Sequence, residues 1–301
     1  MPKNTVVDQL EATILKIQGA YAPSTIRAYR ANFERFIKYC ESMQKSPLPA
    51  SPADIASYIT HLTQSGLKSA SVRIAVASIS SIHKFNQIND PTLDIDVKIE
   101  LRRMNRILGR ASKQAFGITK PMLDKMVSVI KEDLRGLRDK AMLLLAYDSL
   151  CRRSELASIR LDDVECDDGM SPVYIRLRRS KTDQEAIGII VRPTTRTLAC
   201  IKNWIDSSRI RGGHLFRGIK NNGEIMEGIN PGQINRIYKR LAENAGLPKE
   251  KIKRISGHSI RIGAAQDLAE SGSSLPKIMI KGRWSKVETV MRYIERADAN
   301  N

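Results

Sequence analysis

The chain has 301 residues, of which 42% are apolar and 27% carry a charge. This length predicts two domains of ~100–200 residues each, and the composition excludes a fibre or a low-complexity polymer. Lysine and arginine number 50 against 32 acidic residues, which leaves a net charge of +18. So large a basic excess favours nucleic acid as the partner, because phosphate contacts release condensed counterions. A basic protein that is merely soluble is the alternative.

The sequence indicates neither a membrane protein nor a disulfide scaffold. No stretch approaches the ~18–20 unbroken apolar residues of a membrane span, and the N-terminus lacks the apolar core of a signal peptide. The four cysteines are scattered without CxxC spacing, at Cys40, Cys151, Cys166 and Cys200. We therefore expect a soluble, cytoplasmic protein of a reducing compartment.

Residues 1–108 are predicted to form an all-helical bundle. After Ser24, apolar side chains recur every three or four positions and predict one buried stripe, made of Ile26, Tyr29, Phe33, Phe36, Ile37 and Cys40. Ser51 followed by Pro52 predicts the N-cap and first turn of a helix that runs through His61. Two more helical runs follow, one around 72–82 and one over about 92–108, and no strand pattern appears before residue 170.

Residues 109–119 are predicted to be a basic linker between two domains. From Arg102 to Lys120 there are six basic side chains and no acidic one, and the apolar periodicity is lost after Leu108. We expect this segment to lie along a phosphate backbone, whereas a solvated connector would show the same charge.

Residues 120–301 are predicted to form a mostly helical second domain with a small antiparallel sheet. A helix begins at Lys120, and the strongly apolar run over 137–147 predicts a buried one. Alternating residues over 173–177 predict a strand, with 187–191 as its hairpin partner. Further helices are expected over 193–207, 230–245, 259–270 and 275–281, and around Tyr293. The fold class is therefore mainly α, with two domains.

Two pairs of residues have spacings suited to binding a phosphate. His258 and Arg261 stand three apart at a predicted helix start, so an imidazole and a guanidinium share one face near free backbone N–H groups. Arg152 and Glu155 have the same spacing, and a carboxylate beside an arginine fixes the direction of its planar donors. Each pair alone is also typical of a helix cap or an ordinary ion pair.

Two further segments carry groups that could move a proton or attack a phosphate. Lys181 lies in a basic turn between the predicted strands, where neighbouring cations would lower its pKa toward use as a proton donor. Tyr293 lies nine residues after Trp284 in an apolar helix, and cationic neighbours can stabilise a phenolate nucleophile. A solvated turn and a core tyrosine are the ordinary alternatives.

In chain order these residues resemble the pattern of the tyrosine recombinases of the phage integrase family: Arg152, Lys181, His258, Arg261, Trp284 and Tyr293. Residues 146–152, 256–267 and 278–294 are similar to the Cre-like branch of that family, and the resemblance covers nearly the whole chain. It implies a core-binding domain over 1–108 and a catalytic domain over 120–301. It also implies a site-specific DNA recombinase that acts through a 3′-phosphotyrosyl intermediate and a Holliday junction.

The resemblance implies a role for each catalytic position. Tyr293 would be the nucleophile, and Arg152 and Arg261 would hold the non-bridging oxygens of the scissile phosphate. Lys181 would be the general acid for the departing 5′-oxygen. The reaction would need neither a metal nor a cofactor, in agreement with a chain that has only four histidines and no cluster of metal ligands.

Three more residues would complete this site by the same resemblance. His258 would bond the phosphate and help to take the tyrosine proton. Trp284 would donate its indole N–H to a phosphate oxygen, and Glu155 would orient the site without reacting.

DNA contacts are expected from both domains. In the helix over 230–241 the apolar side chains would face inward, leaving for the major groove Gln233, Arg236 and Arg240. Contacts to phosphates alone are the alternative for this helix. On the N-terminal side the expected contacts are Thr25, Arg27, Arg30, Arg73 and Arg106.

The resemblance also implies an assembly on double-stranded DNA with inverted-repeat sites, a dimer on each site and a homotetramer on two sites. A bacterial, phage or plasmid origin is expected. Eight residues follow Tyr293, whereas Cre-like proteins carry a further helix that docks in the neighbouring subunit, so contacts such as those between N-terminal bundles would have to hold the subunits. A type IB topoisomerase or hairpin telomere resolvase shares the chemistry, and a non-catalytic DNA-binding protein needs only the charge.

Overall fold

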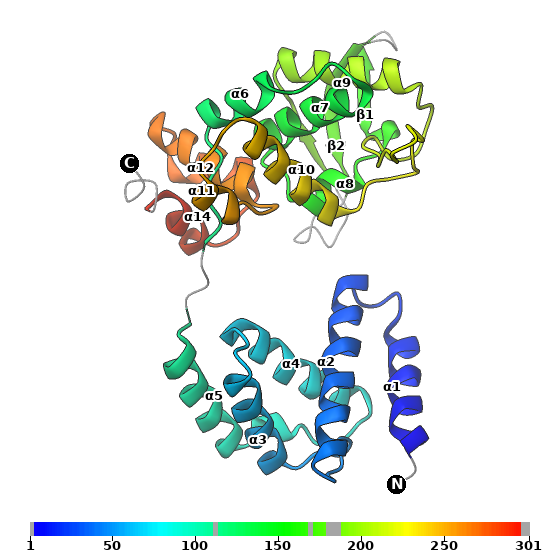
Figure 1. Cartoon of the computed structure of the whole chain (residues 1–301), viewed down its shortest axis with the longest axis vertical. Helices are drawn as coiled ribbons and strands as arrows, with labels where there is room; N and C mark the ends of the chain where they lie inside the picture. The colour runs from blue at the N-terminus through cyan, green and yellow to red at the C-terminus, as the bar shows by residue number, and fades with distance from the viewer. Residues whose placement is uncertain (1–2, 111–113, 168–170, 179–187, 296–301) are drawn as a thin grey trace. The chain divides into compact units, whose positions relative to one another are not determined.

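The computed structural model describes residues 3–110, 114–167, 171–178 and 188–295 (Figure 1). The chain divides into two compact units, Met1–Lys113 and Gln114–Asn301. Each unit has a hydrophobic core of its own. The described residues are mainly helical, as predicted, and their one sheet lies in the second unit.

The N-terminal unit is a helical bundle. Its helices are α1 (Lys3–Ile17), α2 (Pro23–Ser42), α3 (Pro52–Gln64), α4 (Ser69–Phe85) and α5 (Ile95–Leu108). Helix α2 packs on α4 and α3 packs on α5. The predicted stripe of α2 is buried at Phe33, Phe36, Ile37 and Cys40. Ser51 caps α3 as expected, because its side chain accepts the Asp54 backbone N–H at 3.1 Å.

The second unit is built around one buried helix. Its helices are α6 (Lys120–Ser128), α7 (Leu134–Ser149), α8 (Arg153–Ser158), α9 (Thr195–Ser208), α10 (Pro231–Asn244), α11 (Lys249–Lys253), α12 (Ser259–Glu270), α13 (Leu275–Gly282) and α14 (Val287–Ile294). The run Met142–Leu145 of α7 is buried, as its apolar sequence predicts, and α7 packs against α9 and α12. The short helices α8 and α11 are additions to the predicted set.

The sheet has three antiparallel strands in the order β1 (Val164–Asp167), β2 (Ser171–Leu177) and β3 (Ile189–Val191). Ile175 of β2 pairs with Val164 on one side and Val191 on the other, and its side chain is fully buried. The predicted hairpin partners do pair. The expectation of no strand before residue 170 is wrong, because β1 lies at Val164–Asp167. This strand is short and acidic, and a bulge after Glu165 interrupts it, so its sequence does not show the alternation of a strand.

Residues 114–119 pack into the second unit rather than serving as linker. The Phe116 N–H donates to Arg254 O (3.0 Å) and the Ile118 N–H to Ser259 O (2.9 Å). The Ile118 side chain is fully buried. The backbone passes so close to α12 that a Cβ on Gly263 would lie 1.9 Å from Ile118 O. The predicted linker is therefore wrong at its C-terminal end, and residues 111–113 lie outside the described chain.

The C-terminal helices rest on a small apolar cluster of their own. It contains buried side chains of α12, α13 and α14 together with the end of α7, namely Leu150, Ala264, Ala265, Ile278, Trp284 and Val290. Tyr293 packs against this cluster. The cluster brings helix α14 to the turn between α7 and α8.

Candidate active site

The turn from α7 to α8 positions Arg152. Arg152 is the N-cap of α8, and Glu155 lies in the first turn of that helix. Glu155 Oε2 accepts the Arg152 backbone N–H (3.0 Å), and Oε1 accepts Arg152 Nη1 (2.6 Å). One buried carboxylate thus fixes both the backbone and the guanidinium of Arg152. The predicted pair is a cap and an ion pair at the same time.

The start of α12 positions His258 and Arg261. His258 is the N-cap residue, and its backbone N–H donates to Ser256 Oγ (3.1 Å). Arg261 is 3% exposed and donates Nη1 to Leu150 O (2.6 Å) and Nη2 to Gly282 O. Because these carbonyls end α7 and α13, Arg261 ties three segments of the chain together.

The end of α13 and helix α14 bring Trp284 and Tyr293 to the same place. The Arg261 guanidinium carbon lies 4.2 Å from the centroid of the Trp284 ring. The Trp284 and Tyr293 rings meet edge to face with centroids 5.9 Å apart. A Cβ on Gly282 would lie 1.8 Å from the Trp284 ring, so the glycine is what allows the indole to fold back over α13.

These segments surround a cavity of about 260 Å³. Its lining includes five of the seven predicted catalytic residues, Arg152, His258, Arg261, Trp284 and Tyr293. The remaining lining residues were given no role in the sequence analysis and are Arg283, Ser285, Lys286 and Thr289. Glu155 is buried beside Arg152, and Lys181 lies outside the described residues.

The cavity is strongly cationic. Burial, reinforced by the charges of Arg152 and Arg283, lowers the pKa of Arg261 to about 10, so it stays protonated at neutral pH. Burial and then the charges of Arg261, Arg153 and Arg152 lower the pKa of His258, which favours a neutral imidazole. Three guanidiniums on one small cavity create a site for an anion.

Glu155 is held ionised within this cationic surrounding. Burial by itself would raise its pKa, but the Arg152 backbone N–H and the charges of Arg283 and Arg152 outweigh burial and hold the pKa below its ordinary value. The carboxylate therefore remains available to orient arginines. Among the described residues, no group of three or more His, Cys, Asp and Glu side chains is placed to hold a metal ion.

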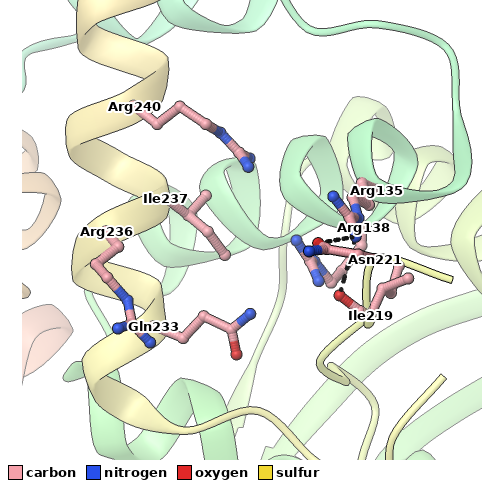
Figure 2. A pocket seen from close by; sticks show the side chains of 8 residues that line it. All are labelled: Arg135, Arg138, Ile219, Asn221, Gln233, Arg236, Ile237 and Arg240. Atoms are coloured by element: carbon pink, nitrogen blue, oxygen red, sulfur yellow. Dashed lines mark hydrogen bonds between the residues drawn. The ribbon is translucent and has the colours of Figure 1, made fainter. Parts of the chain in front are cut away.

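A second cavity, of about 330 Å³, lies beside α10 (Figure 2). Arg135 and Arg138 of α7 donate to carbonyls of the segment 217–220. Arg138 also binds the buried Asp139 (2.6 Å), and the other oxygen of Asp139 accepts Arg240 of α10. Of the three side chains predicted to face outward on α10, Arg240 is therefore the one that binds a buried carboxylate of the protein itself.

Gln233 and Arg236 line the same cavity from α10 (Figure 2), and their side chains make no hydrogen bond with the described residues. The inward set is as predicted, since Ile234, Ile237 and Leu241 are buried. The N-terminal candidates belong to the other unit, where α2 carries Thr25, Arg27 and Arg30, α4 carries Arg73 and α5 carries Arg106. Arg30 pairs with Glu11 at 2.7 Å.

In this site Tyr293 lines one cavity together with the three arginines Arg152, Arg261 and Arg283, an arrangement suited to binding an anion. Residues 117–300 match the phage integrase family, and residues 12–87 match the phage integrase N-terminal SAM-like domain. The chain therefore belongs to the phage integrase family and is a tyrosine site-specific recombinase. None of the described helices is long and apolar enough to cross a membrane.

The relatives include well-known recombinases. The recombinase cre of Escherichia phage P1 is 25% identical over 322 aligned positions, which cover 99% of this chain and 92% of that protein. The integrase/recombinase xerD homolog of Selenomonas ruminantium is 29% identical and covers 98% and 89% of the two chains.

Solved structures share the fold. The XerH site-specific recombinase bound to palindromic difH substrate has a TM-score of 0.68 at 18% identity, over 97% of this chain and 82% of that one. The Tn1549 transposon integrase in complex with transposon right-end DNA has a TM-score of 0.62 at 15% identity, over 97% and 98%.

Proposed function

We propose that this recombinase cleaves and rejoins duplex DNA through a 3′-phosphotyrosyl intermediate, and that two rounds of exchange pass through a Holliday junction. The observation that carries the proposal is the cavity shared by Arg152, Arg261, His258 and Tyr293. Segments more than a hundred residues apart in the chain supply these groups, and their meeting around one cavity supports a tyrosine nucleophile beside an anion site.

In this proposal, Tyr293 attacks the scissile phosphorus and displaces the 5′-oxygen of the DNA. Arg152 and Arg261 hold the non-bridging oxygens and offset the charge that develops in the transition state, a contribution of several kcal/mol for preorganised donors. The neutral imidazole favoured at His258 accepts the tyrosine proton. Trp284 covers the Arg261 guanidinium and donates its indole N–H to the phosphate.

Lys181 is the proposed general acid that protonates the departing 5′-oxygen. Strand β2, which leads toward Lys181, ends beside the site, because Leu177 and Arg178 line a third cavity together with Glu155. Lys181 follows Arg178 by three residues in the sequence. The energy of the broken bond is kept in the phosphotyrosyl ester, so the proposed reaction requires no metal and no cofactor.

Double-stranded DNA is the proposed partner. Several structures that share this fold hold DNA, among them a lambda integrase dimer bound to a core site. We propose that residues 1–108 are a core-binding domain and that the second unit, which begins at Gln114, is the catalytic domain. A dimer would bind each inverted-repeat site, and two such dimers would form the tetramer.

The proposal is tested in two steps. First, the protein is incubated with nicked duplexes of random sequence, and the DNA that stays bound in SDS is sequenced to recover the cleavage site. Second, a circular DNA carrying two copies of that site is incubated with the protein. Junctions and exchanged products support recombination, whereas relaxation without exchange indicates a topoisomerase. Failure to form any SDS-resistant complex contradicts the proposed chemistry and leaves a DNA-binding protein.

A further inference from the structure

The backbone at Arg283 has a conformation that glycine normally adopts. Helix α13 ends in a pair of hydrogen bonds from the Trp284 N–H to Met279 O (3.0 Å) and from the Arg283 N–H to Ile280 O (3.1 Å). In this type of helix end, the residue after the last helical one takes the left-handed conformation and is usually glycine. Here Arg283 takes it, with φ 57° and ψ 48°. An L-residue in this region is strained unless something else holds it there.

The Arg283 side chain is held inside the active site. The side chain is only 6% exposed, and its guanidinium donates Nη2 to Glu155 Oε2 (2.9 Å) and Nη1 to Ser149 O (3.1 Å). Its Nε is buried without a hydrogen-bond partner among the described residues. A strained backbone and an unsatisfied buried donor are both unfavourable for folding, so stability alone does not account for arginine at this position.

The contact with Glu155 connects Arg283 to Arg152. Oε2 of Glu155 accepts both the Arg283 guanidinium and the Arg152 backbone N–H, while Oε1 accepts the Arg152 guanidinium. The carboxylate therefore lies between two arginines and has a fixed orientation. Without Arg283, the same carboxylate could rotate or share its charge with Arg152 alone, and the Arg152 donors would lose their fixed direction.

We propose that Arg283 is a positioning residue for DNA cleavage: it fixes the Glu155 carboxylate, which in turn fixes the Arg152 guanidinium at the scissile phosphate. This inference rests on the proposed function. Arg283 also keeps the cavity cationic, because it offsets the negative charge of Glu155 and leaves the charges of Arg152 and Arg261 for the phosphate. Phosphate binding during the reaction then needs no rearrangement of the arginines.

The test uses the full chain and the duplex recovered by covalent trapping, at saturating protein. The rate at which the covalent complex forms is the readout. Arg283→Gly suits the backbone conformation, which offsets part of the lost ion pair with Glu155, and the variant is expected to fold, as its melting temperature will show. We expect its cleavage rate to fall at least tenfold while its dissociation constant for the duplex changes less than threefold. Arg283→Lys keeps the charge and is expected to recover part of the rate.

A double-mutant cycle shows whether Arg283 acts through Glu155. In a Glu155→Gln background, Arg283→Gly is expected to change the cleavage rate by less than threefold, because the group it orients is already altered. Equal losses in both backgrounds, or an Arg283→Gly variant that cleaves at the wild-type rate, would overturn the inference. If the wild-type chain itself forms no covalent complex, the proposed function fails instead.

Discussion

At the scale of single residues, the site depends on how one carboxylate is shared. Glu155 is 5% exposed and carries ion pairs to both Arg152 and Arg283. The sequence shows the spacing of Arg152 and Glu155, which predicts their contact. It gives no local sign of the Arg283 contact, since 128 residues separate Arg283 from Glu155 and only the packing of α13 against the end of α7 joins them.

The pH dependence of stability should reveal the ionised state of Glu155. Because its pKa is held below the ordinary value, its ion pairs stabilise the fold above that ordinary pKa, and this contribution is lost as the pH falls through the folded-state pKa. We expect Glu155→Gln to lower the free energy of unfolding by about 1.5–3 kcal/mol at pH 7. Urea unfolding at several pH values measures this free energy, and the difference from wild type should shrink only as the pH falls below ~4.3, the ordinary pKa of glutamate. A difference that grows in acid would contradict this assignment.

The proposed role of Lys181 predicts a dependence on the leaving group. Lys181→Ala should slow the cleavage of ordinary DNA by about 10²–10⁴-fold, the usual contribution of a general acid. A duplex with sulfur in place of the 5′-bridging oxygen has a better leaving group and should be cleaved at nearly the wild-type rate. The two rates are compared in single-turnover assays. Equal losses on both substrates would exclude Lys181 as the acid.

At the scale of the secondary-structure elements, close packing of α12 against residues 116–118 supports the whole site. Gly263→Ala would force its Cβ against the Ile118 carbonyl, which cannot move without disturbing the start of α6. We expect the free energy of unfolding to fall by about 1–3 kcal/mol or more. Gly212→Ala is the matched control, because nothing lies within 4 Å of the added Cβ. Thermal unfolding of the two variants measures the difference. Equal melting temperatures for Gly263→Ala and Gly212→Ala would contradict the packing argument.

Helix α10 carries two arginines, Arg236 and Arg240, that differ in their contacts although the sequence of the helix does not distinguish them. Arg240 is paired with the buried Asp139, whereas the Arg236 side chain has no partner among the residues that the structure describes. Arg236→Ala should relax base preference at one position of the recovered site at a cost of about 1–3 kcal/mol in binding. Arg240→Ala should weaken binding to all DNA sequences alike and should lower the free energy of unfolding. Binding to a library of site variants measures both, and a matching loss of base preference in the two variants would refute the distinction.

At the scale of the whole molecule, the strongly periodic elements could be predicted and the short ones could not. The α2 stripe, the Ser51 cap and the buried α7 follow from local patterns, and the structure has all three. Strand β1 and helix α11 have four and five residues, too few for a period to show. The burial of Phe116 and Ile118 depends on contacts with residues far along the chain, which local patterns do not contain.

The candidate site was predictable as a set of residue types but not as a geometry. The ordered residues Arg152, His258, Arg261, Trp284 and Tyr293 indicate the family, and the structure places all five around one cavity. The role of Arg283 has no sign in the local sequence, because its partner Glu155 stands 128 residues away in another helix. The partner of Arg240 was missed for a similar reason, because Asp139 belongs to another helix.

The central claim is that these distant groups act together on one phosphate, with Tyr293 as the nucleophile. The most direct measurement is the SDS-resistant complex between the full chain and the nicked duplex, with the attached peptide identified by mass spectrometry. Wild type should carry the DNA on Tyr293, and Tyr293→Phe should bind the duplex equally well but form no covalent complex. A covalent complex that survives in Tyr293→Phe, or an adduct mapped to another residue, would contradict the account.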